Sequence, residues 1–316
     1  MCSLKRSGKE CVVNMKKILV LGGTRFFGKH LVEELLKLGY DVTIATRGLK
    51  NVHFSKKVNR IIFDRYNEKS IINAFSNEVY DVVYDNLAYS SNDIEILLPH
   101  LKYSKYIVTT STAVYDPLEG EIQEEDFDIS KIVYKNELRD KNRYAYGKRL
   151  VEASIYNKFH NENIIMVRFP FVIGKDDYTK RLEKYIESYI KNQKMYINNL
   201  YDKMNFISSL EAGKFLAFLS NVNYKGPINA ASNRQLSIYD VLEKVSHLEN
   251  DIEEIFKDKV NKLYKSNILL HAPYNDTKGY IINTDKAKDL GFNFSSIDEW
   301  IDDLILYLFW RIKNEE

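Results

Sequence analysis

The sequence predicts an α/β fold built on a doubly wound parallel sheet, with a smaller lobe formed by the C-terminal part of the chain. Three observations support this prediction. Apolar, β-branched runs alternate with amphipathic stretches as far as about residue 174. A glycine-rich turn follows the first run, and a helical pattern begins directly after that turn. Beyond Gly174 the pattern becomes mixed, which indicates a separate lobe where a substrate would lie.

The expected strands are short runs rich in Val, Ile and Tyr, with helical patterns between most of them. A long helical pattern after Arg143 precedes the last of these runs. Such alternation is typical of parallel strands joined by crossover helices, so residues 15–174 are expected to form one nucleotide-binding domain. The runs, in chain order, are "KKILVLGG", "YDVTIATR", "NRIIFD", "YDVVYDNLA", "SKYIVTTST" and "NIIMVRFPFVIG".

Residues 175–316 are expected to form mainly the substrate lobe, with elements near 204–231 returning to the main sheet. The pattern predicts a helix from about Tyr178 to Lys191. It also predicts short strands near Met195 and Phe206. A further helix is expected after the sequence Ser208-Ser209-Leu210-Glu211, because this sequence is a capping box.

The composition argues against several classes of protein. The chain has 46 Lys and Arg against 44 Asp and Glu, which gives a net charge of +2, and the charged residues are scattered along the chain. Nucleic-acid binding is therefore not expected. No apolar run approaches the roughly 18 residues that span a bilayer. The only cysteines, Cys2 and Cys11, are too few for a disulfide framework or a zinc site, and no metal is expected. They lie in residues 1–14, which lack the apolar centre of a secretory signal and are expected to be a disordered extension. A cytoplasmic enzyme is therefore the simplest expectation.

The turn "GGTRFFG" is the first candidate binding site. In the usual dinucleotide fingerprint the middle glycine lets the backbone approach the pyrophosphate, and the last lets the helix pack on the strand. Gly22 and Gly28 fill the outer positions, but Arg25 occupies the middle. Either Arg25 adds a cation beside a phosphate at the helix N-terminus, or it is a solvated side chain on a plain turn. The expected cofactor contacts in this turn are Gly22, Gly23, Thr24, Arg25, Phe26, Phe27 and Gly28.

The end of the second strand favours NADP over NAD. NAD-specific enzymes usually have an acidic residue there for the adenosine ribose, whereas this chain has Arg47. A guanidinium suits a 2′-phosphate, and Arg25 could approach the same group. The alternative is that Arg47 is a solvated strand end. Asp64, after the third strand, is placed to contact the adenine edge, or else to cap the helix that follows.

Tyr144 and Lys148 are the candidate catalytic pair. They are four residues apart on one face of an expected helix. Tyr274 and Lys278 share this spacing, but they lie in a proline-containing loop without a neighbouring strand, and we expect them to be inert. Tyr144 instead follows a strand that ends in hydroxyl residues, "VTTSTAVYD", at the edge of the sheet where ligands bind in open α/β folds.

Taken together, "GGTRFFG", "STAVYD", "YAYGK", "RFPFVIG" and "DKAKDLGF" resemble the extended short-chain dehydrogenase/reductases, the NAD-dependent epimerase/dehydratase family. The resemblance runs from Met15 to about Trp300. The arginine in the glycine turn is closest to an atypical branch that is similar to the chloroplast stem-loop RNA-binding proteins. The resemblance implies a Rossmann domain that binds NAD(P), a substrate lobe, and an assembly that could be a homodimer.

The resemblance also implies roles for individual residues. Tyr144 would be the general acid/base, and Lys148 would bind the nicotinamide ribose and lower the pKa of the tyrosine. Ser111 would hydrogen-bond the same substrate oxygen; alternatively, it is a strand-end hydroxyl bonded to backbone. The cofactor would further contact Leu87, Ala88, Pro170 and Phe171, of which Pro170 and Phe171 could equally be ordinary core.

Two hypotheses about function follow. The first is an NAD(P)-dependent epimerase, dehydratase or reductase that acts on a sugar-like or other small hydroxyl or carbonyl substrate. The second is a non-catalytic binding module, either a redox sensor or an RNA-associated protein, which the altered glycine turn favours. Enzymes of this family that act on nucleotide sugars usually carry two arginines for the diphosphate, and this chain has Lys203-Met204 and "HAPYNDTKGY" at those places. Arg234 could compensate.

Overall fold

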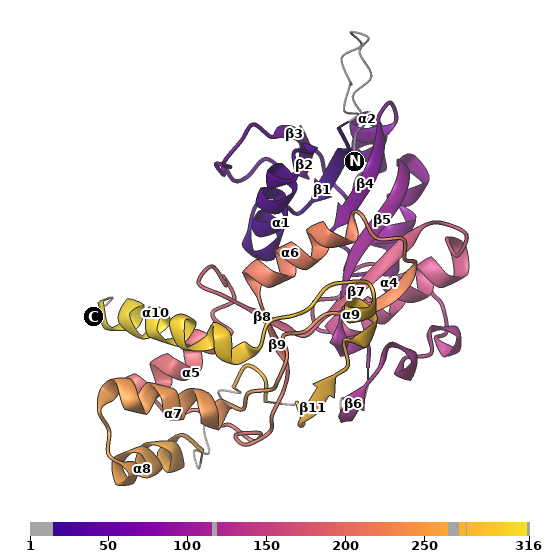
Figure 1. The fold of residues 1–316 in the computed structure, drawn as a ribbon. Coiled ribbons are helices and arrows are strands. Elements are labelled where there is room, and N and C mark those ends of the chain that lie inside the picture. The colour runs from indigo at the N-terminus through magenta and orange to yellow at the C-terminus, as the bar shows by residue number, and fades with distance from the viewer. Residues whose placement is uncertain (1–14, 116–118, 265–271, 276, 315–316) are drawn as a thin grey trace.

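The central element of the molecule is a seven-stranded parallel sheet with the strand order β10-β7-β5-β4-β1-β2-β3 (Figure 1). The computed structural model describes residues 15–115, 119–264, 272–275 and 277–314, so the extension expected at 1–14 lies outside the described residues. The predicted fold class is confirmed. The strands of the sheet are β1 (Lys17–Leu21), β2 (Asp41–Thr46), β3 (Asn59–Ile62), β4 (Val79–Asp85), β5 (Lys102–Ser111), β7 (Ile164–Phe169) and β10 (Gly226–Asn229).

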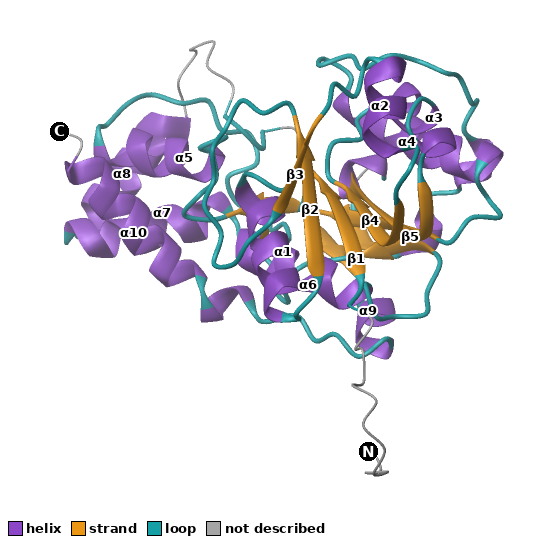
Figure 2. Ribbon diagram, turned by 90° about the horizontal axis from the view of Figure 1, so that it is seen from above, coloured by secondary structure: helices purple, strands orange, loops and turns teal. Residues whose placement is uncertain are grey.

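Helices cover both faces of this sheet (Figure 2). On one face α1 and α6 pack against each other and against the apolar side chains of the strands. On the other face α2, α3 and α4 bury a second set of apolar side chains. The near-continuous apolar strands are thus buried on both sides, as parallel sheets require. The helices are α1 (Phe26–Lys37), α2 (Glu68–Phe75), α3 (Ser91–Glu95), α4 (Tyr144–Lys158) and α6 (Ser209–Leu219).

The C-terminal lobe has its own apolar core, formed mainly by four helices that lie together beside the sheet (Figures 1 and 2). Two small parallel strand pairs, β8 with β9 and β6 with β11, lie outside the main sheet. The chain returns to the main sheet at β10, which pairs with β7. The remaining elements are β6 (Gly120–Ile122), β8 (Phe171–Ile173), α5 (Arg181–Ile190), β9 (Phe206–Ser208), α7 (Ile238–Glu249), α8 (Glu253–Tyr264), β11 (Tyr280–Ile282), α9 (Asp285–Asp289) and α10 (Ile301–Asn314). Short 3₁₀ turns cover Leu98–His100, Thr112–Val114, Glu124–Asp126, Ile129–Lys131 and Ile297–Glu299.

Two local predictions for this lobe differ from the structure. The helix expected from Tyr178 begins only at Arg181, because Thr179 donates to the Asp177 carboxylate and Lys180 has a left-handed backbone (φ 54°). The strand expected near Met195 is wrong: only an isolated bridge forms there, at Tyr196. The polar loop after it is held by side chains instead, for example by the Asn199 amide, which donates to the carbonyl of Tyr274 at 2.7 Å.

The sheet topology brings the carboxyl ends of four strands to one edge. These ends are Leu21, Thr46, Asp85 and Ser111, from β1, β2, β4 and β5. Ligands of open α/β folds bind outside this edge. The described helices include none that is both long and apolar enough to cross a membrane.

Candidate active site

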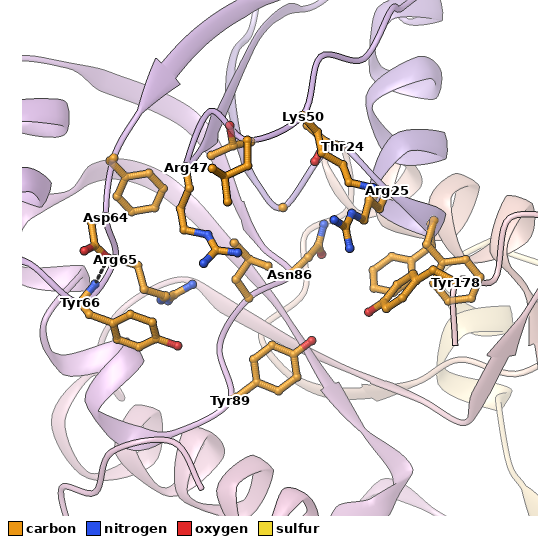
Figure 3. A pocket seen from close by; sticks show the side chains of 18 of the residues that line it. Thr24, Arg25, Arg47, Lys50, Asp64, Arg65, Tyr66, Asn86, Tyr89 and Tyr178 are labelled. Carbon is orange, nitrogen blue, oxygen red and sulfur yellow. Dashed lines mark hydrogen bonds between the residues drawn. The ribbon is translucent and has the colours of Figure 1, made fainter. Parts of the chain in front are cut away.

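The glycine turn joins β1 directly to α1. Gly22 has a left-handed backbone (φ 86°), and a Cβ on Gly28 would lie 2.1 Å from the carbonyl oxygen of Gly22, so both positions require glycine. Arg25 is the residue before α1, and its extended backbone (φ −144°, ψ 153°) is open to any residue. Phe26 carries the unusual conformation instead (φ 53°). The turn therefore closes without a middle glycine, and the Arg25 side chain is directed into a cavity (Figure 3).

That cavity has a volume of about 330 Å³ and lies at the carboxyl edge of the sheet. Nine residues that the sequence predicts as cofactor contacts line it, but six others, Gly23, Ala88, Tyr144, Lys148, Pro170 and Phe171, do not. Gly23 is buried against Val32 and Ile44, so its role is packing. The predicted residues that line the cavity are Gly22, Thr24, Arg25, Phe26, Phe27, Gly28, Arg47, Asp64 and Leu87. The lining residues that sequence reasoning missed are Thr46, Leu49, Lys50, Phe63, Arg65, Tyr66, Asn86, Tyr89, Arg139 and Tyr178.

Positive charge dominates the cavity wall. Arg25, Arg47, Lys50 and Arg139 line it, and none of them has an ion-pair partner within the part of the chain that the structure describes. Figure 3 shows Arg25 and Arg47 extending toward the same space beside Asn86. The cavity is thus suited to an anionic ligand.

Asp64 is the acidic residue among the lining side chains. Its carboxylate accepts the backbone N–H of Tyr66 at 3.0 Å, as the dashed line in Figure 3 marks. The following helix α2 is capped by Asn67, which accepts from the N–H of Ser70 at 3.1 Å. Asp64 therefore does not cap that helix and remains available on the cavity wall.

Asn86 supplies an independent sign that the cavity is built for a ligand. It follows β4, only 7% of its surface is exposed, and neither its amide nitrogen nor its amide oxygen has a hydrogen-bond partner among the described residues. Leaving both groups buried and unpaired costs free energy. Its amide nitrogen would be 3.4 Å from a Cβ on Gly28, so it borders the same turn. A polar ligand in the turn would satisfy it.

A buried ion pair fixes the floor of the cavity. Arg65 donates to both carboxylate oxygens of Asp85, at 2.9 and 2.6 Å, and Asp85 also accepts from the hydroxyl of Tyr106 and the N–H of Leu87. Burial acts to raise the pKa of Asp85, but the Arg65 guanidinium and these hydrogen bonds hold it below its usual value. The ionised pair holds the end of β4 and the turn at Leu87 in place.

Lys148 is buried at the first turns of α4. Its ammonium donates to the carbonyl oxygens of Ala88 and Thr109 at 2.7 and 2.8 Å, and lies 4.4 Å from the centre of the Tyr89 ring. Burial lowers the pKa of Lys148 to about 7, although Asp85 and Asp93 act to raise it. Gly147 makes this approach possible, because a Cβ there would be 2.3 Å from the carbonyl oxygen of Tyr89.

Tyr144 is the first residue of α4 and is 47% exposed. Burial of its hydroxyl end raises its pKa, while a hydrogen bond with Ser111 and the charge of Arg181 act to lower it. The net direction of the Tyr144 pKa is upward, and the Lys148 ammonium is directed to the carbonyls of Ala88 and Thr109, so a lowering of this pKa by Lys148 stays a prediction. Ser111 also accepts the N–H of Ala113 at 3.2 Å, so its hydroxyl contacts both backbone and Tyr144.

The residues expected near the nicotinamide lie partly in the core of the lobe. Pro170 is buried, and Phe171 lies 4.3 Å from the ring of Tyr274 and 6.0 Å from that of Phe206. The contacts of Phe171 are therefore those of an ordinary core residue, which was the alternative to a cofactor contact. Arg234 is exposed and pairs with Asp298, so it does not line the cavity.

Three comparisons relate these features to known proteins. Residues 18–99 match the model of the NAD dependent epimerase/dehydratase family. The chain is 35% identical over 114 residues to the chloroplast stem-loop binding protein of 41 kDa b from Arabidopsis thaliana; the match covers 32% of this chain and 30% of that protein. The aligned part thus spans less than a third of that relative.

Solved structures match nearly the whole fold. A protein assigned as an epimerase, from Burkholderia cenocepacia J2315, has a TM-score of 0.71 at 17% identity, over 95% of this chain and 98% of that one. The UDP-glucuronic acid 4-epimerase from Bacillus cereus, solved with UDP-glucuronic acid and NAD, has a TM-score of 0.67 at 17% identity, over 95% and 100%. The dTDP-glucose 4,6-dehydratase from Bacillus anthracis str. Ames, solved with NAD, has a TM-score of 0.68 at 16% identity. That match covers 92% of this chain and 95% of the dehydratase. Residues 18–99 are therefore similar to the NAD dependent epimerase/dehydratase family, and the chain as a whole has the fold that these epimerases and dehydratases share.

Proposed function

We propose that this protein is an NADP-dependent oxidoreductase of the epimerase, dehydratase or reductase type, acting on a hydroxyl or carbonyl group of a small sugar-like substrate. The observation that carries this proposal is the meeting of Ser111, Tyr144 and Lys148 beside a cationic cavity at the carboxyl edge of the sheet. The match of residues 18–99 to the family model supports a nicotinamide cofactor in that cavity.

The residues of the cavity fit such a cofactor. Gly22 and Gly28 let the turn close tightly before the N-terminus of α1, where a pyrophosphate would bind, and Asn86 offers an amide that lacks a partner among the described residues. Arg25 and Arg47 would bind a 2′-phosphate, since a guanidinium pairs well with phosphate oxygens. Asp64 would contact the adenine, and Lys148 the nicotinamide ribose. The nicotinamide, when bound, supplies or accepts a hydride.

Tyr144 moves the proton in this proposal. Because its pKa is raised, the phenol is neutral near pH 7 and can donate its proton to a substrate carbonyl oxygen that becomes a hydroxyl. In the reverse direction the ionised tyrosine takes the proton from the substrate hydroxyl. Ser111 holds the same oxygen, and the partly protonated Lys148 helps to stabilise the phenolate.

The test of this role is substitution of Tyr144 by Phe, which removes the hydroxyl and keeps the ring. We expect turnover to fall about 10² to 10⁴-fold while NADPH still binds, since general acid–base groups contribute about that much. Lys148→Ala should weaken both turnover and cofactor binding. In the oxidative direction the parent enzyme should become faster as pH rises, until the phenol is ionised.

Activity is measured with a panel of sugars, aldehydes, ketones and alcohols, by nicotinamide absorbance together with product analysis. Product analysis is needed because an epimerase returns its hydride to the substrate and leaves no net change in nicotinamide absorbance. A Tyr144→Phe variant that turns over a substrate as fast as the parent would contradict the proposed mechanism.

A second candidate, a nucleic-acid-binding module, is favoured by one observation: the similar Arabidopsis protein is named as a stem-loop binding protein. Against it, the net charge of this chain is only +2. Failure of the parent protein to turn over any member of the substrate panel would make this candidate the better account.

A further inference from the structure

Glu152 and Arg168 form a completely buried ion pair that joins α4 to β7. Neither side chain is exposed, and Arg168 is among the largest fully buried side chains in the described part of the chain. Its guanidinium donates to both carboxylate oxygens, from Nε to Oε1 at 3.0 Å and from Nη2 to Oε2 at 2.5 Å. Removing two charges from water is costly, so a buried pair is weak evidence of a stabilising role. The contacts of the pair point to a role in holding its neighbours in place.

Further hydrogen bonds occupy the third nitrogen of the Arg168 guanidinium. Nη1 donates to the hydroxyl of Tyr115 and to the carbonyl oxygen of Glu124, both at 2.8 Å. The Tyr115 hydroxyl in turn donates to the amide oxygen of Asn229 at 2.7 Å. The guanidinium is thus bound to β10 and to the segment after β5 as well as to α4, and it holds the Glu152 carboxylate in one orientation.

The Glu152 carboxylate also binds the end of β5. The Thr110 hydroxyl donates to Glu152 Oε1 at 2.7 Å, and both side chains are buried. Its contact with the carbonyl oxygen of Val167 is longer, at 3.3 Å. Thr110 is paired in register with Arg168 on the neighbouring strand, and it directly precedes Ser111, the last residue of β5. The bond from Thr110 to Glu152 therefore fixes α4 relative to the strand end that carries Ser111.

Glu152 lies on the same face of α4 as the two proposed catalytic residues of that helix. Tyr144, Lys148 and Glu152 follow one another at intervals of four residues, which places their side chains along one side of a helix. Lys148 donates to the carbonyl oxygen of Thr109 at 2.8 Å. Two consecutive residues of β5, Thr109 and Thr110, are thus bonded to two successive turns of α4. Tyr144 lies on the turn before them.

From this geometry we propose that Glu152 is a positioning residue for proton transfer, which acts by fixing the place of Tyr144 relative to Ser111. A buried hydrogen bond to a charged group is directional and shielded from water, whereas apolar packing has no preferred direction. The inference rests on the proposed function, because that function assigns the reacting oxygen to Tyr144 and Ser111. It goes beyond that function in naming residues that do not line the cavity: Glu152, Thr110 and Arg168.

The test removes the hydrogen bond at Thr110 and leaves the ion pair intact, because an unpaired buried charge would destabilise the whole fold. Thr110→Val replaces the hydroxyl by a methyl group of similar size, and Thr110→Ser keeps the hydroxyl. We expect Thr110→Val to lower turnover about tenfold or more, because misplaced reacting groups lose rate steeply, while NADPH binds as in the parent. Thr110→Ser should restore most of the turnover, which a pure packing effect would not do.

Hydrogen exchange gives a second measurement, which needs no substrate. Peptides that cover residues 144–152 should exchange faster in Thr110→Val than in the parent, because α4 opens locally more easily without the bond, and Thr110→Ser should exchange like the parent. Ser154→Ala is the matched control. It removes another buried hydroxyl of α4, one without a hydrogen-bond partner among the described residues, and should change neither turnover nor exchange.

The outcomes are distinct. Parent-like turnover or parent-like exchange of α4 in Thr110→Val overturns the inference, and so does an equal loss in Thr110→Val and Thr110→Ser, since that result reports packing alone. If Tyr144→Phe slows turnover but Thr110→Val does not, the proposed function stands and only this inference fails. If the parent protein turns over no member of the substrate panel, the proposed function fails, and this inference fails with it.

Discussion

Arg25 occupies a position where the usual turn has a glycine, and the structure indicates how it is tolerated. Its backbone is extended, and the left-handed conformation falls on the next residue, Phe26 (φ 53°). A non-glycine residue in this region costs of order 1–3 kcal/mol and is typical of functional sites. The Arg25 guanidinium lies 5.6 Å from the ring of Tyr178 and faces the cavity. A side-chain cation thus stands where a close backbone approach would otherwise bind phosphate.

Tyr274 gives a prediction at the same scale. Tyr274→Phe should leave turnover and cofactor binding unchanged, because its hydroxyl has no partner among the described residues and the phenylalanine keeps the contact with Phe171. Its sequence partner Lys278 is directed to Glu119 at 3.3 Å. Steady-state kinetics and urea unfolding measure both effects. A loss of turnover with intact cofactor binding would move the proton-transfer site to Tyr274.

Some residues of the cavity could be predicted from the sequence and others could not. Gly22, Gly28 and Arg47 line the cavity as predicted, because the motif and the strand end fix their places. Asn86 and Arg139 also line it, but they lie in loops where neither periodicity nor a motif marks them. The upward direction of the Tyr144 pKa could not be predicted from the sequence, because burial, which outweighs the other influences on it, is a property of the folded chain alone.

At the scale of elements, α4 is the helix that carries the proposed catalytic residues Tyr144 and Lys148 beside the cavity. Its residue Gly147 allows the helix to approach the carbonyl of Tyr89, and Tyr89 lines the cavity. Lys148 then reaches the carbonyls of Ala88 and Thr109 from the same helix. The position of this one helix therefore decides both the lysine contacts and the place of Tyr144.

Gly147→Ala should disturb this arrangement, because its Cβ would lie 2.3 Å from the carbonyl oxygen of Tyr89. We expect a loss of stability of about 1–3 kcal/mol from overpacking and a fall in turnover of roughly 10²-fold from misplaced catalytic groups. Urea unfolding and steady-state kinetics test the two effects separately. Asn157→Ala, at the exposed far end of α4, is the matched control. Parent-like stability and turnover of Gly147→Ala would show that the helix does not need this close approach.

The elements themselves were predictable where the pattern was strong. The six apolar runs all became strands of the main sheet, because buried parallel strands need near-continuous apolar sequence. The start of α5 and the absent strand near Met195 were missed, since side-chain hydrogen bonds of Asp177 and Asn199 decide them. Such bonds depend on tertiary neighbours that a local pattern does not contain.

For the whole molecule, charge is balanced overall and concentrated locally. The net charge is +2, yet the cavity wall carries Arg25, Arg47, Lys50 and Arg139 without ion-pair partners among the described residues. A near-neutral surface with a cationic cavity is suited to a small anionic ligand more than to an extended nucleic acid. We therefore propose that this cavity binds a dinucleotide with a 2′-phosphate.

Calorimetric titration of NADPH and NADH into the same protein tests this claim most directly. We predict that NADPH binds about tenfold or more tightly than NADH, since charge-assisted hydrogen bonds to a phosphate contribute that much, and that Arg47→Gln removes most of the difference. Arg234→Gln, away from the cavity, should change neither affinity. Equal affinities for the two nucleotides, binding of neither, or an Arg47→Gln variant that binds NADPH as tightly as the parent would contradict the account.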